Sequence, residues 1–133
     1  MYGSPRPRGT LTVSLVSFGF KHGLPYDADL VFDLRFLPNP HFVEALRVHD
    51  GRDREVTDWL FAHPESRELL GRLEDLVQFL LPLYQREGKA YLTIALGCTG
   101  GKHRSVAFVE SLRGFLEAQG FAPIVRHRDL GRE

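Results

Sequence analysis

Short apolar runs alternate along the chain with longer amphipathic stretches. Runs rich in β-branched and aromatic residues predict four strands, at residues 10–20, 30–34, 91–96 and 121–125. Apolar residues at helical spacing predict two main helices, at residues 64–88 and 105–119. Strands separated by helices indicate the α/β class, with a small, mainly parallel sheet and flanking helices.

The remaining stretches have weaker patterns. Residues 39–57 show no clean period and predict an irregular excursion with one helical turn at 43–47, followed by a short helix at 57–63. Pro82 is expected to kink or fray the end of the long helix. Residues 1–9, with two prolines and little to bury, are expected to form a flexible lead-in to a single domain of residues 10–133.

Composition excludes several function classes. The formal net charge is zero, so no global field attracts nucleic acid or an anionic membrane. The single cysteine cannot form an internal disulfide, which agrees with a reducing cytosol. No segment is long and apolar enough to span a bilayer, and the six histidines show no metal-ligand spacing. We therefore expect a cytoplasmic protein with no membrane partner, no metal and no cofactor.

The stretch YLTIALGCTGGKHRSVA at residues 91–107 carries the strongest chemical signal. It predicts a strand that ends at Gly97, a glycine loop, and a helix that begins at Ser105. Backbone N–H groups of such a loop and of the first helical turn bind anions. The anion-binding residues expected here are Thr99, Gly100, Gly101, Lys102, His103, Arg104 and Ser105.

Polar residues also follow the other predicted strands. They include Lys21 and His22, Asp33 and Arg35, and the segment 126–129. Ligands of open parallel sheets collect at the carboxyl ends of the strands. These side chains are therefore expected to form one basic cleft with the glycine loop.

The spacing of Cys98 and Arg104 leaves an alternative open. Cys-x5-Arg followed by Ser is the pattern of cysteine-dependent phosphatases, in which a thiolate attacks phosphorus and the arginine holds the phosphoryl oxygens. Asp129 or Asp33 would serve as the acid. Gly97 stands where those enzymes usually have a histidine, and a lone cysteine at a strand end is more often buried than reactive.

Four blocks in the same order, SFGFKHG, DADLVFDLRFLPNP, GCTGGKHRSV and RHRDL, resemble the C-terminal domain of the RapZ/YvcJ family of bacterial RNase adapter proteins. The resemblance spans about residues 11–130. It implies an α/β domain that binds an amino-sugar phosphate and, in some members, a small RNA and a ribonuclease. The ligand residues that it implies are His22, Thr99, Gly100, Gly101, His103, Arg104 and Ser105.

Two departures limit what the resemblance implies. Family members normally begin with a nucleotide-binding domain that carries a G-x-x-x-x-G-K-[ST] loop, and this chain has none, so it is expected to be a stand-alone or cut-out C-terminal module without an ATP or GTP role. RNA-binding members end in a lysine and arginine run, and this chain has instead a weak RNA patch of Arg126, Arg128 and Arg132, to which Arg6 and Arg8 can add. We expect a non-enzymatic sensor of a phosphorylated amino sugar. A phosphatase, a plain RNA-binding module and a homo-oligomer remain open.

Overall fold

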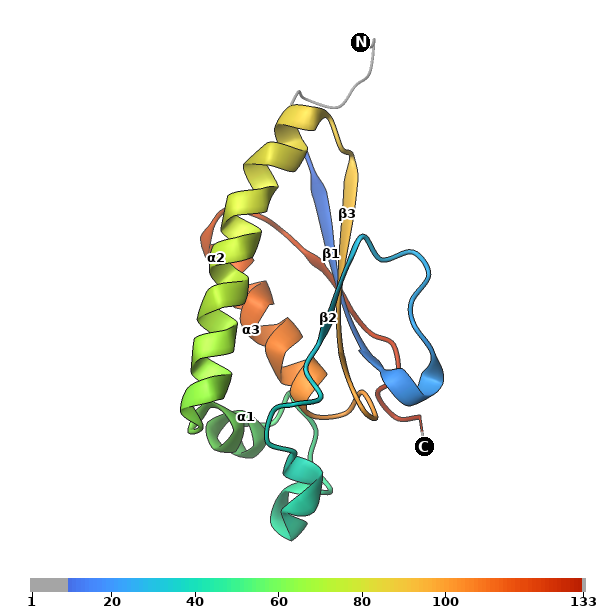
Figure 1. Cartoon of the computed structure of the whole chain (residues 1–133), viewed down its shortest axis with the longest axis vertical. Coiled ribbons are helices and arrows are strands. Elements are labelled where there is room, and N and C mark those ends of the chain that lie inside the picture. The colour runs from blue at the N-terminus through green and yellow to red at the C-terminus, as the bar shows by residue number, and fades with distance from the viewer. Residues whose placement is uncertain (1–9, 133) are drawn as a thin grey trace.

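A four-stranded parallel sheet forms the centre of the protein, whose computed structural model describes residues 10–132 (Figure 1). The strands are β1 (Thr12–Gly19), β2 (Leu30–Asp33), β3 (Tyr91–Cys98) and β4 (Ile124–His127), in the order β2-β3-β1-β4. Every pairing between them is parallel, which confirms the predicted α/β class. The predicted lead-in at residues 1–9 lies outside the described residues.

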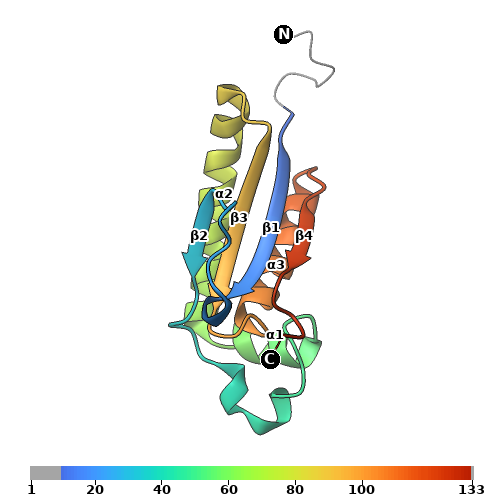
Figure 2. The ribbon, with the colours of Figure 1, turned by 90° about the vertical axis from the view of Figure 1, so that its right-hand side faces the viewer.

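The three α-helices are α1 (Arg54–Phe61), α2 (Pro64–Glu87) and α3 (Arg104–Ala118). Helices α2 and α3 cover one face of the sheet, and α1 lies on the same side near the carboxyl ends of the strands (Figures 1 and 2). The residues of α3 from Arg104 to Val109 are all buried, so this helix lies at the centre of the core rather than on its surface. None of the described helices is both long and apolar enough to cross a membrane.

The opposite face of the sheet has a second, smaller core. Val16, Phe18 and Ala95 form it, and Phe20 packs against them from the short 3-10 turn Phe20–His22 that follows β1. A Cβ atom on Gly97 would lie 2.4 Å from the Phe18 ring. Gly97 therefore lets Phe18 pack across β3, and the strand continues to Cys98 instead of ending at Gly97 as predicted.

Several predicted boundaries also move. Helix α3 begins at Arg104 rather than Ser105, and β4 begins at Ile124 rather than at residue 121, because strand pairing with β1 starts there. The excursion at residues 39–57 contains two 3-10 helices, at Pro40–Phe42 and Glu44–Leu46, and the start of α1.

Helix α2 does not fray at Pro82, although the sequence predicted a kink or a frayed end there. It continues to Glu87 and ends at Gly88, which has a φ of 94°. The N–H of Lys89 donates to the Tyr84 carbonyl at 3.0 Å and closes the helix beyond the proline. The core contact of Leu81 and this cap together hold the last turns in place.

Asp129 holds the carboxyl ends of the strands together. Its buried Oδ2 accepts the N–H of Gly19 at 2.7 Å, and its two oxygens also pair with Arg128 and Arg132. Burial raises the pKa of Asp129, but the donors from Arg128, Gly19 and Arg132 outweigh it and hold the pKa below its usual range. The carboxylate is therefore charged at neutral pH.

The backbone of the glycine loop packs directly on the end of β1. A Cβ atom on Gly19 would lie 2.4 Å from the carbonyl carbon of Gly100, and one on Gly101 would lie 2.6 Å from the nitrogen of Gly19. Gly101 also has a φ of 79°, a conformation that other residues rarely adopt. Neither position leaves room for a side chain.

Gly19→Ala should destabilise the protein by about 1–3 kcal/mol, because the new methyl group must push the glycine loop away from β1. Gly71→Ala is the matched control, since nothing lies within 4 Å of its Cβ position in α2. The control should be neutral or stabilising by up to about 1 kcal/mol. Urea unfolding measures both changes, and equal effects of the two substitutions would contradict the close packing at Gly19.

Asp129→Asn should lower the free energy of unfolding at pH 7 by about 2 kcal/mol, because it removes the buried negative charge that accepts hydrogen bonds from half-buried Arg128 and exposed Arg132. The folded-state pKa of Asp129 lies below its unfolded value of about 3.9, so this carboxylate stabilises the protein above about pH 4 and loses that effect as the pH falls further. Urea unfolding between pH 7 and pH 2 should show a smaller acid loss in the variant. Asp58→Asn, at an exposed ion pair with Arg54, should change stability by less than about 1 kcal/mol.

Candidate functional site

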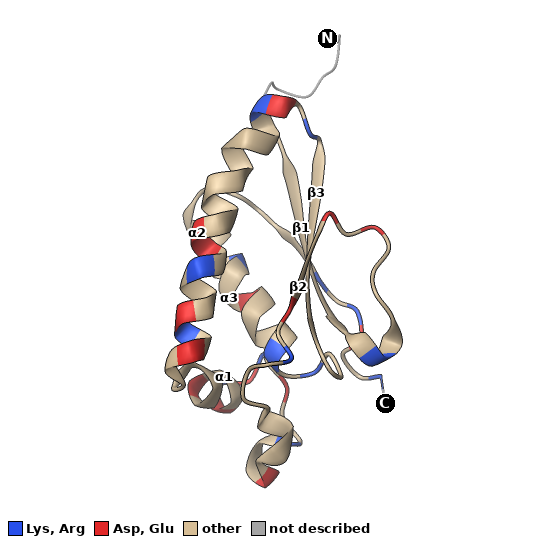
Figure 3. Ribbon diagram, viewed as in Figure 1, with Lys and Arg blue, Asp and Glu red and all other residues tan. Residues whose placement is uncertain are grey.

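A pocket of about 320 Å³ opens at the carboxyl edge of the sheet. Four segments far apart in sequence form it. They are the 3-10 turn after β1, which contributes Lys21, the turn after β2, the β3–α3 loop and the C-terminal segment. In Figure 3, several Lys and Arg positions, coloured blue, lie around this end of the sheet. The lining residues are Lys21, Asn39, His41, Phe42, Cys98, Thr99, Gly100, Lys102, His103, Arg104 and Arg132.

Arg104 lies at the base of this pocket and is only 3% exposed. Its Nη1 donates to the carbonyls of Arg35 at 2.8 Å and Leu37 at 3.0 Å, which fixes the plane of the guanidinium. Its Nη2 lies 3.5 Å from Thr99 Oγ1, and its Nε has no partner among the described residues. Nη1 of the guanidinium is therefore fully used in contacts with the backbone, whereas the edge formed by Nε and Nη2 keeps unused donors.

Burial lowers the pKa of the Arg104 guanidinium, whereas nearby Cys98 and Asp33 act in the opposite direction. An arginine stays protonated in proteins even when it is desolvated. The base of the pocket thus holds a buried positive charge with incomplete hydrogen bonding. An anion that accepts from Nε and Nη2 would balance the buried charge and complete the hydrogen bonding of the guanidinium.

His103 is the second buried side chain of the pocket with an unused polar atom. It is 5% exposed, and its Nε2 has no partner among the described residues. Burial lowers its pKa and outweighs the backbone groups of His49 and Leu46, so the imidazole is neutral at pH 7. A neutral imidazole offers one donor and one acceptor, which suits hydroxyl or amino groups.

Cys98 lines the pocket, with its Sγ 3.2 Å from the Ser105 hydroxyl. Both residues are buried. The two carboxylates considered as phosphatase acids lie elsewhere: Asp33 is paired with Arg35 at 2.8 Å, and Asp129 is enclosed by its own arginines. Among the described residues, the pocket lining contains no carboxylate.

Three predicted site residues lie beside the pocket rather than in its lining. Gly101 packs against β1, and Ser105 contacts the cysteine sulfur. His22 is in the 3-10 turn after β1, and its Nε2 is buried without a partner among the described residues. The pocket lining does bring together Thr99, Gly100, Lys102, His103 and Arg104 from the predicted set.

The turn after β2 contributes lining residues that the sequence patterns did not single out: Asn39, His41 and Phe42. The Asn39 side chain accepts the N–H of His41 at 3.0 Å, and Arg47 Nε donates to the His41 carbonyl at 2.9 Å. The available signal is a histidine in the proline-containing loop that follows a predicted strand. That position places it at the carboxyl edge of a parallel sheet.

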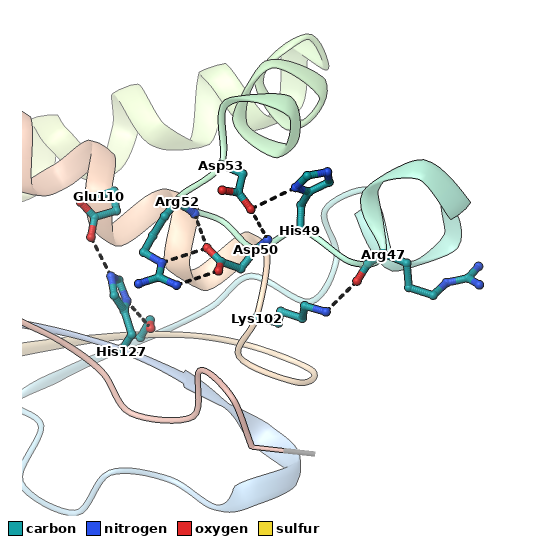
Figure 4. Close-up of polar contacts among 9 residues, drawn as sticks. Arg47, His49, Asp50, Arg52, Asp53, Lys102, Glu110 and His127 are labelled. Carbon is teal, nitrogen blue, oxygen red and sulfur yellow. Dashed lines mark hydrogen bonds and ion pairs between the residues drawn. The ribbon is translucent and has the colours of Figure 1, made fainter.

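A segment around Gly51 supports the glycine loop from outside (Figure 4). Lys102 Nζ donates to the Arg47 carbonyl at 2.6 Å, and the Gly51 N–H donates to the Lys102 carbonyl at 2.9 Å. A Cβ atom on Gly51 would lie 2.3 Å from the His103 carbonyl oxygen. In the part of the chain that the structure describes, no three His, Cys, Asp or Glu side chains are grouped so that they could hold a metal ion.

Comparison with known proteins assigns the family. The chain is 54% identical over 132 residues to a nucleotide-binding protein of Parafrankia sp., and the match covers 99% of this chain and 45% of that protein. It is 53% identical over 119 residues to a nucleotide-binding protein of Geobacter sulfurreducens, covering 90% of this chain and 42% of that protein. The chain thus spans less than half the length of these relatives. A model of the RapZ C-terminal domain matches residues 11–131, and the chain therefore belongs to the RapZ C-terminal domain family.

Proposed function

We propose that this domain is a regulatory module that binds a phosphorylated amino sugar of the glucosamine 6-phosphate type in the pocket at the carboxyl edge. The supporting observation is the buried guanidinium of Arg104, whose Nε has no partner among the described residues. A buried charge with an unused donor is costly unless a ligand of opposite charge completes it. A phosphate group supplies that charge and accepts from Nε and Nη2 together.

The surrounding residues suit the rest of such a ligand. The Thr99 hydroxyl and the loop at Gly100 lie next to the guanidinium and offer further phosphate donors. His103 and His41 offer polar ring atoms for sugar hydroxyl or amino groups. Gly101 and Ser105, which the family resemblance also implied, hold the loop in position in this proposal, and His22, implied as well, lies in the 3-10 turn beside the pocket.

The proposal is for binding without hydrolysis. A cysteine-dependent phosphatase needs an acid for the leaving group beside its thiolate and arginine. Cys98 and Arg104 share the pocket, but Asp33 and Asp129 are both held in ion pairs outside its lining. This arrangement favours a ligand that stays intact.

The same proposal links ligand binding to RNA or a ribonuclease partner. Arg132 lines the pocket and shares Asp129 with Arg128, so a ligand that contacts Arg132 also acts on the arrangement of the C-terminal segment. Arg126 does not pair with Asp129 among the described residues, and its Nη2 lies 3.9 Å from Asp27 Oδ2. These three arginines are the proposed RNA contacts.

Arg104→Lys should weaken the binding of glucosamine 6-phosphate about 10- to 100-fold in calorimetry. Lysine keeps the positive charge but loses the paired Nε and Nη2 donors, and a charge-assisted hydrogen bond is worth about 1.5–3 kcal/mol. Arg72→Lys is the matched control, because that guanidinium lies on the exposed side of α2, far in sequence from the pocket residues, and pairs with Glu68. Its affinity should equal that of the wild type.

Circular dichroism should show that both variants remain folded. Equal affinities of the wild type and Arg104→Lys, or no binding by the wild type, would reject the proposal. Release of inorganic phosphate that disappears in Cys98→Ser would instead identify a phosphatase.

RNA retention on a filter should fall steeply with added salt, with a slope of log affinity against log salt of about −2 for three phosphate contacts to a single strand. Saturating glucosamine 6-phosphate should change that retention, since the ligand and the RNA both engage Arg132. Retention that does not depend on salt would contradict the arginine contacts, and retention that does not depend on the ligand would contradict the proposed link.

A further inference from the structure

Helix α2 carries an apolar stripe on the side that does not pack on the core. Its three residues, spaced by three and four positions along the helix, are Leu76, Phe79 and Leu83. Phe79 is 64% exposed, and the two leucines are 38% and 40% exposed. In Figure 1, α2 is the outermost element on the helical side of the molecule, so the stripe faces outward.

The stripe lies in a part of α2 that has no charged residue. Residues 76–85 contain no Asp, Glu, Lys or Arg, whereas the helix is densely charged before this segment and carries Arg86 and Glu87 after it. Figure 3 shows the contrast, with red and blue positions in the first half and at the end of α2 and tan positions between them. The outward face of a surface helix is normally polar. A contiguous, exposed and uncharged stripe instead indicates a surface that another protein covers.

Charged side chains border the stripe at both ends. Asp75 precedes it, Arg86 and Glu87 follow it, and all three are exposed. The ion pair that α2 forms among the described residues joins Arg72 to Glu68. Asp75, Arg86 and Glu87 therefore have no ion-pair partner in the part of the chain that the structure describes.

The apolar stripe is complementary to a second copy of itself. If two copies of α2 pack antiparallel about a two-fold axis between Phe79 and Leu80, residues equally far from the axis meet. Leu76 of each copy then meets Leu83 of the other, and the two Phe79 rings lie together at the centre. This packing buries the whole stripe.

The bordering charges are complementary in the same arrangement. Arg72 of one copy meets Glu87 of the other, because both lie equally far from the axis. Asp75 comes close to Arg86 of the second copy, since helical side chains lean towards the N-terminus of their own helix and the Arg86 guanidinium therefore leans towards the axis. A cation also relieves the acidic end of the stripe, where burial and the Asp75 carboxylate raise the pKa of Glu74. A parallel packing would instead place each charge opposite its own copy.

We propose that the apolar stripe of α2 is a dimerisation surface, and that its occupant is α2 of a second copy of this chain, packed antiparallel about a two-fold axis beside Phe79. No residue of α2 lines the ligand pocket, so each copy keeps its own pocket. The inference therefore stands apart from the proposed binding of an amino-sugar phosphate.

Sedimentation velocity of the full chain at increasing concentration tests the dimer. The wild type should approach twice the mass of the chain. Phe79→Glu should weaken association at least about 100-fold, because the symmetric interface receives the new charge twice at its centre. Ile124→Glu is the matched control, since Ile124 is 58% exposed at the start of the edge strand β4, and it should leave association unchanged.

A mixture of two charge variants tests the antiparallel packing. Asp75→Arg places like charges together at both ends of its own dimer, and so does Arg86→Asp. Each variant alone should associate about fivefold more weakly than the wild type, or weaker still. When the two variants are mixed, position 75 of each copy again faces an opposite charge at position 86 of the other, so association should return to near the wild-type strength.

Every outcome bears on the second copy as occupant. A wild type that stays monomeric at all concentrations would overturn the inference, as would a dimer that survives Phe79→Glu. Loss of the dimer in Ile124→Glu alone would instead identify pairing of edge strands. A mixture that associates no more tightly than either charge variant would overturn the antiparallel packing. If circular dichroism shows that Phe79→Glu is unfolded, the mixture decides alone.

Discussion

The arrangement of this domain depends on a contact between two pieces of backbone. The end of β1 and the loop after β3 approach so closely that Gly19 and Gly101 can carry no side chain. Strand register brings Gly19 opposite Cys98, and Asp129 fastens the contact by accepting the Gly19 N–H from the C-terminal segment. The buried carboxylate of Asp129 thus connects the end of β1, on which the glycine loop packs, to the last residues of the chain.

Burial of α3 gives the pocket its chemistry. Because the first turns of this helix lie inside the core, the Arg104 side chain lies in the buried part of the pocket and not at its exposed edge. Backbone carbonyls of the turn after β2 satisfy one edge of the guanidinium, and this fixes its orientation. A buried, oriented charge loses less side-chain entropy on binding than an exposed arginine does, which favours tight binding of a small anion.

The glycine loop is connected to its surroundings on both sides. The segment at residues 47–53 bonds to Lys102 from one side, and Arg132 approaches from the other. A ligand that binds to both side chains therefore contacts the irregular segment after β2 and the C-terminal segment together.

The sequence by itself determined the α/β class, the strand, glycine loop and helix at residues 91–118, and the family, because these depend on periodicity and on short motifs that are local in the chain. Tertiary structure alone decided the membership of the pocket. It placed Ser105 on the cysteine sulfur and Gly101 on β1, and it brought His41 from the turn after β2 to the lining. It also gave Arg104 its buried position and Asp129 its partners. Those outcomes depend on the order of the strands and on how the helices pack, which decide which residues come into contact. No local pattern in the sequence encodes contacts between segments so far apart in the chain.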